Sequence, residues 1–328
     1  MATLHRKPSL STVAVAVAAL SACGGGPASR VEQASSQPES VAAVTTLDAG
    51  NPVASEVVRA PENERRILEY IPSTYGFVVH LSLNKLEASQ LFNRHESMLL
   101  GSLETQRQTV IKNCHFDPLL DIETITLAID LRNGNSPEVL FALSTALGAT
   151  RLEECVVALG GNVSEGAYDV GGDTMSFYWP TEDVLLLSDK KSSDDMMLEL
   201  RAGRSLDNPQ LMEVLSRTDR LATMWGAGTI SNAVAANLSV LGVVPKSFVV
   251  RGSVWAGVDL TLELSFATDK DANGMMNMIK MGLGNSSGQA SPFRELIEAI
   301  DVEQFGTLIR LEAQLSPELS GELLKELQ

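Results

Sequence analysis

Histidine, cysteine and positive charge are all scarce in this chain of 328 residues. His80, His95 and His115 follow His5 without the spacing of a zinc site, and no Gly-rich phosphate-binding loop is present. Lysine and arginine number 25 against 41 acidic residues, for a formal charge of -16. Such an acidic chain binds nucleic acid poorly and is not attracted to anionic lipid. The sequence therefore predicts no metal site, no cofactor and no nucleic-acid partner.

Long apolar runs are also absent, apart from one short run near the start of the chain. Arg6 and Lys7 precede an apolar run from Leu10 to Leu20. A helix of this length rises only about 16 Å, whereas a bilayer core is about 30 Å thick. The pattern is typical of a signal peptide, which we expect to occupy residues 1–22 and to be removed.

The residues Leu20-Ser21-Ala22-Cys23 resemble the lipobox of bacterial lipoproteins. The resemblance covers only residues 1–26. It implies that Cys23 becomes the N-terminus and carries several acyl chains, including palmitate, which would anchor the protein stably to a membrane. Gly24 stands where an aspartate often retains a lipoprotein in the inner membrane, so the resemblance favours the outer membrane. The alternative is an ordinary secretory signal followed by an accidental cysteine.

Residues 23–63 have the composition of a flexible linker. They contain no aromatic residue and are rich in Gly, Ser, Ala, Gln and Pro. A flexible segment of about 38 residues reaches about 35 Å on average, which would hold a domain clear of the lipid headgroups. Apolar periodicity begins near Glu64, and the remaining residues are enough for one large domain or two small ones.

Alternating apolar residues predict antiparallel strands with one buried face. One hairpin is expected to turn at Asn133-Gly134 and another at Ala256-Gly257. On the strand expected at 76–83, His80 shares the less apolar side with Val78 and Ser82. The expected strands cover residues 76–83, 125–131, 139–143, 175–179, 184–188, 221–229, 248–254, 260–266 and 307–315.

Capping residues predict helices between these strands. Thr150 to Glu153 fits a capping box, and Asn208-Pro209, Ser291-Pro292 and Ser316-Pro317 are typical helix starts. Further helices are expected from about Asn84, Asp194 and Asp271.

These elements predict an α+β fold in which helices pack mainly on one face of an antiparallel sheet. The order strand, helix, two strands, helix, strand occurs in residues 64–205 and again in residues 206–328. This is the ferredoxin-like, or split βαβ, order. The sequence therefore suggests two related halves, although a single α+β domain with alternating elements would give the same order.

Lipidation of Cys23 leaves Cys114 and Cys155 in an exported, oxidising compartment. Cys155 lies on the apolar face of its expected helix, and Cys114 precedes a strand in the same half. A bridge between them would close a loop of about 41 residues and stabilise the fold by about 4 kcal/mol in the chain-entropy model. We expect this disulfide, with two buried thiols as the alternative.

Met275, Met276, Met278 and Met281 cluster on one expected helix. Methionine is flexible and polarisable, and it is common at surfaces that bind varied apolar partners. These residues either form a face for an apolar ligand or pack against the sheet as core.

Two further motifs lack essential parts. Residues 284–288 have the letters of a nucleophile elbow, but a helix is expected before them and no histidine follows. Residues 269–274 match the start of a calcium loop, but Lys280 stands where that loop needs a glutamate.

The sequence thus predicts a lipid-anchored cell-envelope protein with a non-catalytic binding or structural role. Its globular part would be periplasmic or surface-exposed. Its partners would be the membrane, through Cys23, and another envelope protein. One alternative is a carrier or chaperone for apolar cargo, which the methionine cluster favours. Another is an enzyme built on Asp and Glu side chains, which spacing does not reveal.

Overall fold

The structure is a computed structural model, and it describes residues 62–130, 138–164, 167–170, 173–188, 193–230, 235, 242–285 and 293–326. The expected signal peptide, Cys23 and the linker up to residue 61 lie outside these ranges. Helix α2 begins at Glu62, so the last two residues of the expected linker are helical.

The first half of the described chain contains strands joined by short helices and hairpins. Its elements are α2 (Glu62–Glu69), β1 (Phe77–Ser82), α3 (Leu83–Glu87), α4 (Gln90–Leu100), α5 (Ser102–Cys114), α6 (Pro118–Asp121), β2 (Ile122–Asp130), β3 (Glu138–Thr145), α7 (Ala149–Ala158), β4 (Asn162–Ser164), β5 (Ala167–Val170), β6 (Asp173–Thr181), β7 (Val184–Ser188) and α8 (Ser193–Ala202).

The second half has fewer described elements. They are the 3-10 helix η1 (Ser205–Asp207), α9 (Pro209–Ser216), β8 (Met224–Thr229), β9 (Ser247–Val254), β10 (Val258–Ser265), α11 (Asp269–Asn285), α12 (Phe293–Glu298), β11 (Ile300–Phe305), β12 (Leu308–Leu315) and α13 (Pro317–Glu326). Among the described residues, no helix is both long enough and apolar enough to cross a membrane.

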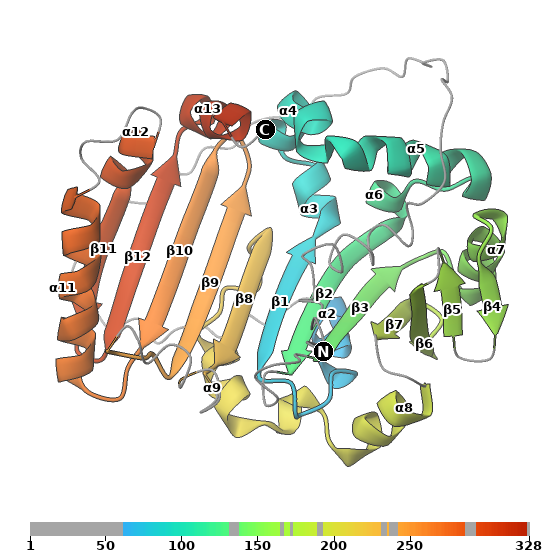
Figure 1. The fold of residues 1–328 in the computed structure, drawn as a ribbon, viewed down its shortest axis with the longest axis horizontal. Coiled ribbons are helices and arrows are strands. Elements are labelled where there is room, and N and C mark those ends of the chain that lie inside the picture. The colour runs from blue at the N-terminus through green and yellow to red at the C-terminus, as the bar shows by residue number, and fades with distance from the viewer. Residues whose placement is uncertain are drawn as a thin grey trace, which may run out of the picture.

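All these strands form one twelve-stranded sheet, which confirms an α+β fold built on an antiparallel sheet. The strand order is β11-β12-β10-β9-β8-β1-β2-β3-β7-β6-β5-β4 (Figure 1). The halves meet where β1 pairs with β8. The predicted hairpins β2–β3 and β9–β10 are present, although the turn expected at Asn133-Gly134 lies outside the described residues.

The prediction of two ferredoxin-like halves is wrong. In a split βαβ unit, the strands on either side of the first helix are parallel and separated by a third strand. Here β1 and β2 are direct antiparallel neighbours. The order of elements along the chain does not fix which strands pair. In addition, the sequence predicts no strand at β11, and the split βαβ order counts the two strands expected at 175–179 and 184–188 as one. The two halves do share an order, since β1-β2-β3-β7-β6 corresponds to β8-β9-β10-β12-β11.

One face of the sheet, here called the front, is turned to the viewer in Figure 1. A single row of paired residues crosses this face through ten strands, and every member is apolar or glycine. In sheet order the row is Val302, Leu311, Leu262, Val250, Gly226, Val79, Leu127, Phe141, Leu187 and Phe177.

Helices pack on both faces of the first half, which contradicts the prediction that they lie mainly on one. Ile67 and Leu68 of α2 pack on the back face against Val78, Ala128 and other residues of the central strands. On the front face, α5 and α7 cover β2, β3 and β7. In the second half, α11, α12 and α13 pack near the edge and the upper ends of the strands (Figure 1).

Two helix starts test the capping predictions. Asn208 caps α9 by accepting from the backbone N–H groups of Gln210 and Leu211, as predicted. Helix α7 begins one residue before the expected capping box, after Gly148, whose missing side chain makes no capping hydrogen bond. The capping box at Thr150 is therefore wrong.

Candidate functional site

Cys114 and Cys155 form a disulfide between α5 and α7, as predicted. Their Cα atoms are 4.8 Å apart, and both residues are buried. The bond joins two helices that together cover the front of β2, β3 and β7. It therefore fixes one end of the cover over the first half of the sheet.

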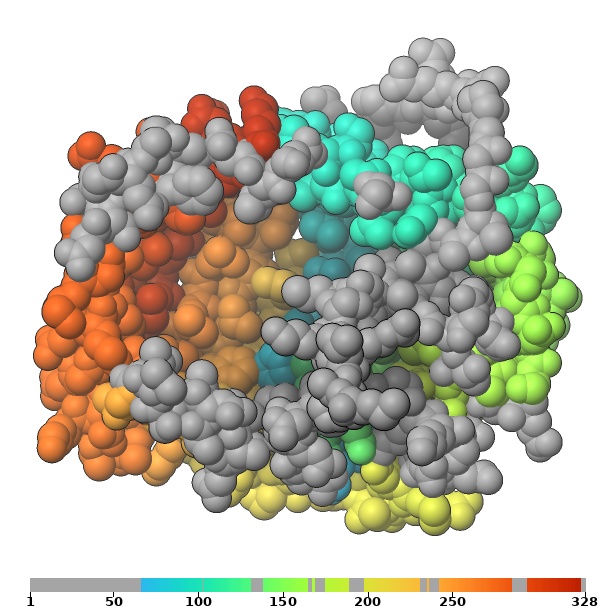
Figure 2. All heavy atoms as spheres, in the orientation of Figure 1, coloured from blue at the N-terminus to red at the C-terminus, as the bar shows by residue number. Residues whose placement is uncertain are grey.

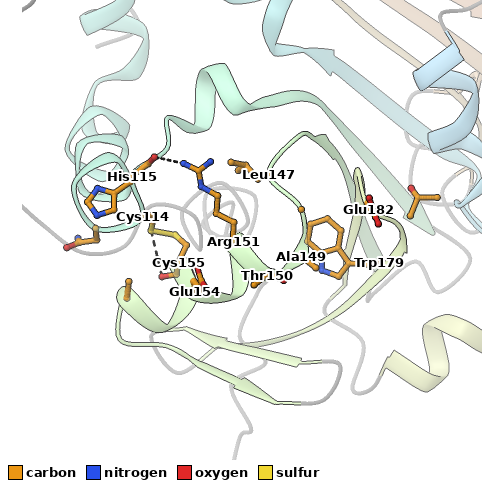
Figure 3. Close-up of a pocket in the computed structure, with 14 residues that line it drawn as sticks. Cys114, His115, Leu147, Ala149, Thr150, Arg151, Glu154, Cys155, Trp179 and Glu182 are labelled. Atoms are coloured by element: carbon orange, nitrogen blue, oxygen red, sulfur yellow. Dashed lines mark hydrogen bonds between the residues drawn. A yellow bond between two sulfur atoms is a disulfide. The ribbon is translucent and has the colours of Figure 1, made fainter.

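A cavity of about 980 Å³ lies beside this disulfide (Figure 3). Arg151 of α7 crosses it and donates to the backbone oxygen of His115 at 2.6 Å. Trp179 and Glu182 close the opposite side, at the β6–β7 turn. The Arg151 side chain is thus held by the carbonyl of His115 at the end of α5, so it links α7 to α5. The arrangement includes no nucleophile paired with a base.

The three histidines of the globular part lie in different places. His80 is 1% exposed, stacks on Trp225 with ring centroids 5.2 Å apart, and has its Nδ1 2.8 Å from the Thr126 hydroxyl. The His95 ring lies beside α13, where a Cβ at Gly321 would stand 3.1 Å from its Nε2, and His115 ends α5 with a positive φ of 59°. The described residues contain no group of three or more His, Cys, Asp or Glu that could hold a metal ion.

The four methionines proposed as an apolar-ligand face are spread around α11. Met276 is buried against β12, and Met275 packs on the same cluster. Met278 is half-buried, and Met281 is 61% exposed. Successive helical residues are separated by 100°, so these four positions span more than half of the helix circumference. Met281 in particular points away from the core cluster.

The sheet itself offers a larger apolar surface, over its centre. Eight apolar side chains on the front of five adjacent strands are half-buried, and they belong to none of the four core clusters formed by the described residues. Figure 2 shows this face hollowed over β9 and β10. We call these residues the central apolar surface: Phe77, Val79, Leu81, Ile129, Met224, Phe248, Val250 and Leu262.

Three glycines keep this surface low and flat. A Cβ at Gly228 would stand 2.9 Å from the Phe77 ring and 3.0 Å from the Phe248 ring, and a Cβ at Gly226 would stand 2.9 Å from Val250. A Cβ at Gly252 would stand 3.2 Å from Leu260 and 3.3 Å from Met224. The neighbouring side chains therefore lie over the glycines. The Phe77 and Phe248 rings meet there at 5.1 Å.

A polar cleft of about 820 Å³ opens at the lower ends of the same strands, beside α9. Gly76, Thr229 and Ser247 line it, and each is the chain neighbour of a residue on the front of the sheet. Arg217 crosses it and donates to the hydroxyls of Ser265 at 2.8 Å and Ser247 at 3.2 Å. Lys246, Asp130 and Glu213 also line the cleft, so it contains charges of both signs.

Sequence reasoning missed both the central apolar surface and this cleft. The available signal was the run Trp225-Gly226-Ala227-Gly228, because glycine weakens a strand interior and often marks a close approach by a ligand or by another chain. The sequence pattern predicts a strand for this run but gives its glycines no function.

Comparisons with known proteins add little. No family model matches the chain, and no curated protein matches it. Among solved structures, crystal form I of TP0453 is similar over 79% of this chain and 96% of that chain, with 12% sequence identity and a TM-score of 0.42. A likeness at this level assigns neither a family nor a function.

Proposed function

We propose that this chain is a lipid-anchored cell-envelope protein with a non-catalytic role, and that it binds the acyl chain of an envelope lipid on the central apolar surface. The observation that carries this proposal is the half-buried state of eight apolar side chains on one continuous sheet face. Apolar patches that stay partly exposed favour interaction sites, because leaving apolar area in water costs free energy.

The size of the surface favours a small ligand over a protein. Five strands at about 4.8 Å spacing and about five residues along each strand give an area of roughly 400 Å². A stable protein interface buries about 800 Å² on each partner. A bound acyl chain gains about 0.8 kcal/mol for each buried CH2 group, so a long chain needs no larger surface.

The chemistry of the surface also favours an acyl chain. The backbone groups beneath it are paired within the sheet, and its side chains carry no nitrogen or oxygen atom. An extended peptide lying there would leave its own N–H and C=O groups without partners, at a cost of several kcal/mol. An acyl chain has no such groups.

Binding is tested with a fluorescent fatty acid and two matched variants of the full chain carrying Cys23→Ser. Leu262 and Thr261 are adjacent on β10 but lie on opposite faces. Leu262→Gln should weaken binding about tenfold, because it places an amide on the apolar surface. Thr261→Gln should leave binding unchanged. If both variants bind like the parent protein, the ligand does not use this surface.

Anchoring is a separate test. Cells expressing the wild-type chain should incorporate labelled palmitate into it, and cells expressing the Cys23→Ser chain should not. If neither chain is labelled, the proposed anchor is wrong, whatever the binding assay shows.

A further inference from the structure

Lys246 extends the front face of the sheet by one position beyond the central apolar surface. Its backbone N–H donates to the Ser265 carbonyl at 2.6 Å, and its carbonyl accepts from Ile230 at 2.8 Å, so the β9 ladder continues through it. Side chains alternate along a strand, and Lys246 is therefore on the same side as Phe248 and Val250. It also lines the polar cleft.

Lys246 is a cation available to a ligand at the front face. Lys246 is exposed and forms no ion pair with the described residues. Arg217 also has no carboxylate partner among them, but two serine hydroxyls hold it on the back side of the sheet, with Val249. The formal charge of the whole chain is -16. An unpaired positive charge at the end of an apolar surface is therefore unusual in this protein. Asp130 and Glu213 line the same cleft, and their carboxylates would repel a ligand that carries several negative charges.

We propose that the ligand is a single-chain amphipathic lipid, with its chain on the central apolar surface and its anionic headgroup, a phosphate or a carboxylate, at Lys246. This inference rests on the proposed function and names the chemistry of its ligand. An apolar surface that ends in one exposed cation is complementary to a molecule with an apolar chain that ends in an anionic headgroup. Lysine carries a compact charge on a flexible stem, so it can follow headgroups of different size.

The test compares ligands that share a 16-carbon chain and differ only in headgroup. Palmitate supplies a carboxylate, hexadecyl phosphate a phosphate, and hexadecanol no charge. Each is titrated into the full chain carrying Cys23→Ser, and into the same chain with Lys246→Gln or with Lys270→Gln. Lys270 is an exposed lysine on α11 and serves as the charge-matched control.

We expect at least one anionic ligand to bind about tenfold more tightly than hexadecanol, which corresponds to about 1.4 kcal/mol. Lys246→Gln should remove that preference without changing the affinity for hexadecanol, and Lys270→Gln should keep it. The phosphate and carboxylate arms identify the preferred headgroup. Equal binding of all three ligands by the parent chain would overturn this inference while leaving acyl-chain binding intact. No binding of any ligand would instead overturn the proposed function. A preference that persists in Lys246→Gln would place the headgroup elsewhere.

Discussion

The two halves of the sheet share a strand order but differ in what covers their faces. In the first half, β7 is buried at every position, because helices pack on both of its sides. In the second half, β10 has only one buried residue, Glu263, and its other positions are half-buried or exposed. Among the described residues, the same topology therefore gives a closed core around β7 and a less buried sheet face around β10.

The back face shows where this change occurs. One row of paired residues there runs from charged and polar side chains in the second half to buried ones in the first. In sheet order the row is Asp301, Glu312, Thr261, Arg251, Trp225, His80, Thr126, Ala142 and Leu186. The row changes from polar to buried residues between Arg251 of β9 and Trp225 of β8. The junction of the two halves, between β8 and β1, is one strand away. The back face of β9 and β10 is mostly polar, although Val249 and Glu263 are buried there, so the front is the more apolar side of these two strands.

The largest expected effect concerns the disulfide that fixes the cover of the first half. Replacing Cys114 and Cys155 by serine should lower the free energy of unfolding by about 4 kcal/mol, because the loop of 41 residues gains freedom in the unfolded chain. Urea denaturation of the variant and of the parent measures this change. Adding a reductant should shift the parent towards the variant and leave the variant unaffected. Equal stability of the two proteins would show that the cover does not depend on the bond.

The same substitution in the two halves should have different costs. Leu186 is 0% exposed in the core of the first half, and Leu186→Ala should cost about 3 kcal/mol. Leu262 is half-buried on the central apolar surface, and Leu262→Ala should cost about 1 kcal/mol or less. Urea midpoints of the two variants give the comparison. Equal costs would mean that the second half is as closed as the first.

Alkaline pH should weaken the core of the first half. Tyr168 is 7% exposed and stacks on Phe177 at 3.9 Å, and burial raises its pKa to about 12. The unfolded chain releases this proton near pH 10, so stability is present below pH 10 and is lost as the pH rises towards 12. The loss should reach about 2 kcal/mol by pH 11.5. Tyr168→Phe should show a smaller loss over the same range, and an unchanged loss would assign the effect to other groups.

The smallest expected effect on stability concerns the glycines of the central apolar surface. Gly228→Ala would bring a methyl group to about 3 Å from the Phe77 and Phe248 rings, which can shift because they are half-buried. We expect a change in unfolding free energy below about 1 kcal/mol, because the reduced freedom of the unfolded chain offsets part of the strain. Binding of the fluorescent fatty acid should weaken, because the surface is raised. A large loss of stability with unchanged binding would mean that Gly228 serves packing alone.

Sequence reasoning predicted the parts of this molecule that depend on local patterns. The hairpins β2–β3 and β9–β10 followed from alternation, and the start of α9 followed from Asn208-Pro209. The pairing of Cys114 with Cys155 followed from the small number of cysteines. The order of strands in each half did not follow, because β11 is short and directly follows a helix, and because the pairing of strands depends on residues far apart in the chain.

Which face of a strand is buried is likewise not a local property. On β1 the less apolar side, with Val78, His80 and Ser82, is fully buried, whereas Phe77, Val79 and Leu81 are half-buried. Alternation shows that the two sides differ, but only the packing of neighbouring helices decides which side is closed. Here α2 and α9 lie over the side with His80, and Trp225 stacks on its ring.

The sequence by itself determined the alternation of apolar residues along each strand, the two cysteines available for pairing and the strongly acidic surface, because each of these depends on residue type and spacing alone. Only the tertiary structure decided that ten strands align their apolar residues into one row, that the described helices pack on both ends of that row, and that Lys246 lies at the end of a strand between them. The physical reason is that strand order and helix placement depend on contacts between residues far apart in the chain, which no local pattern contains.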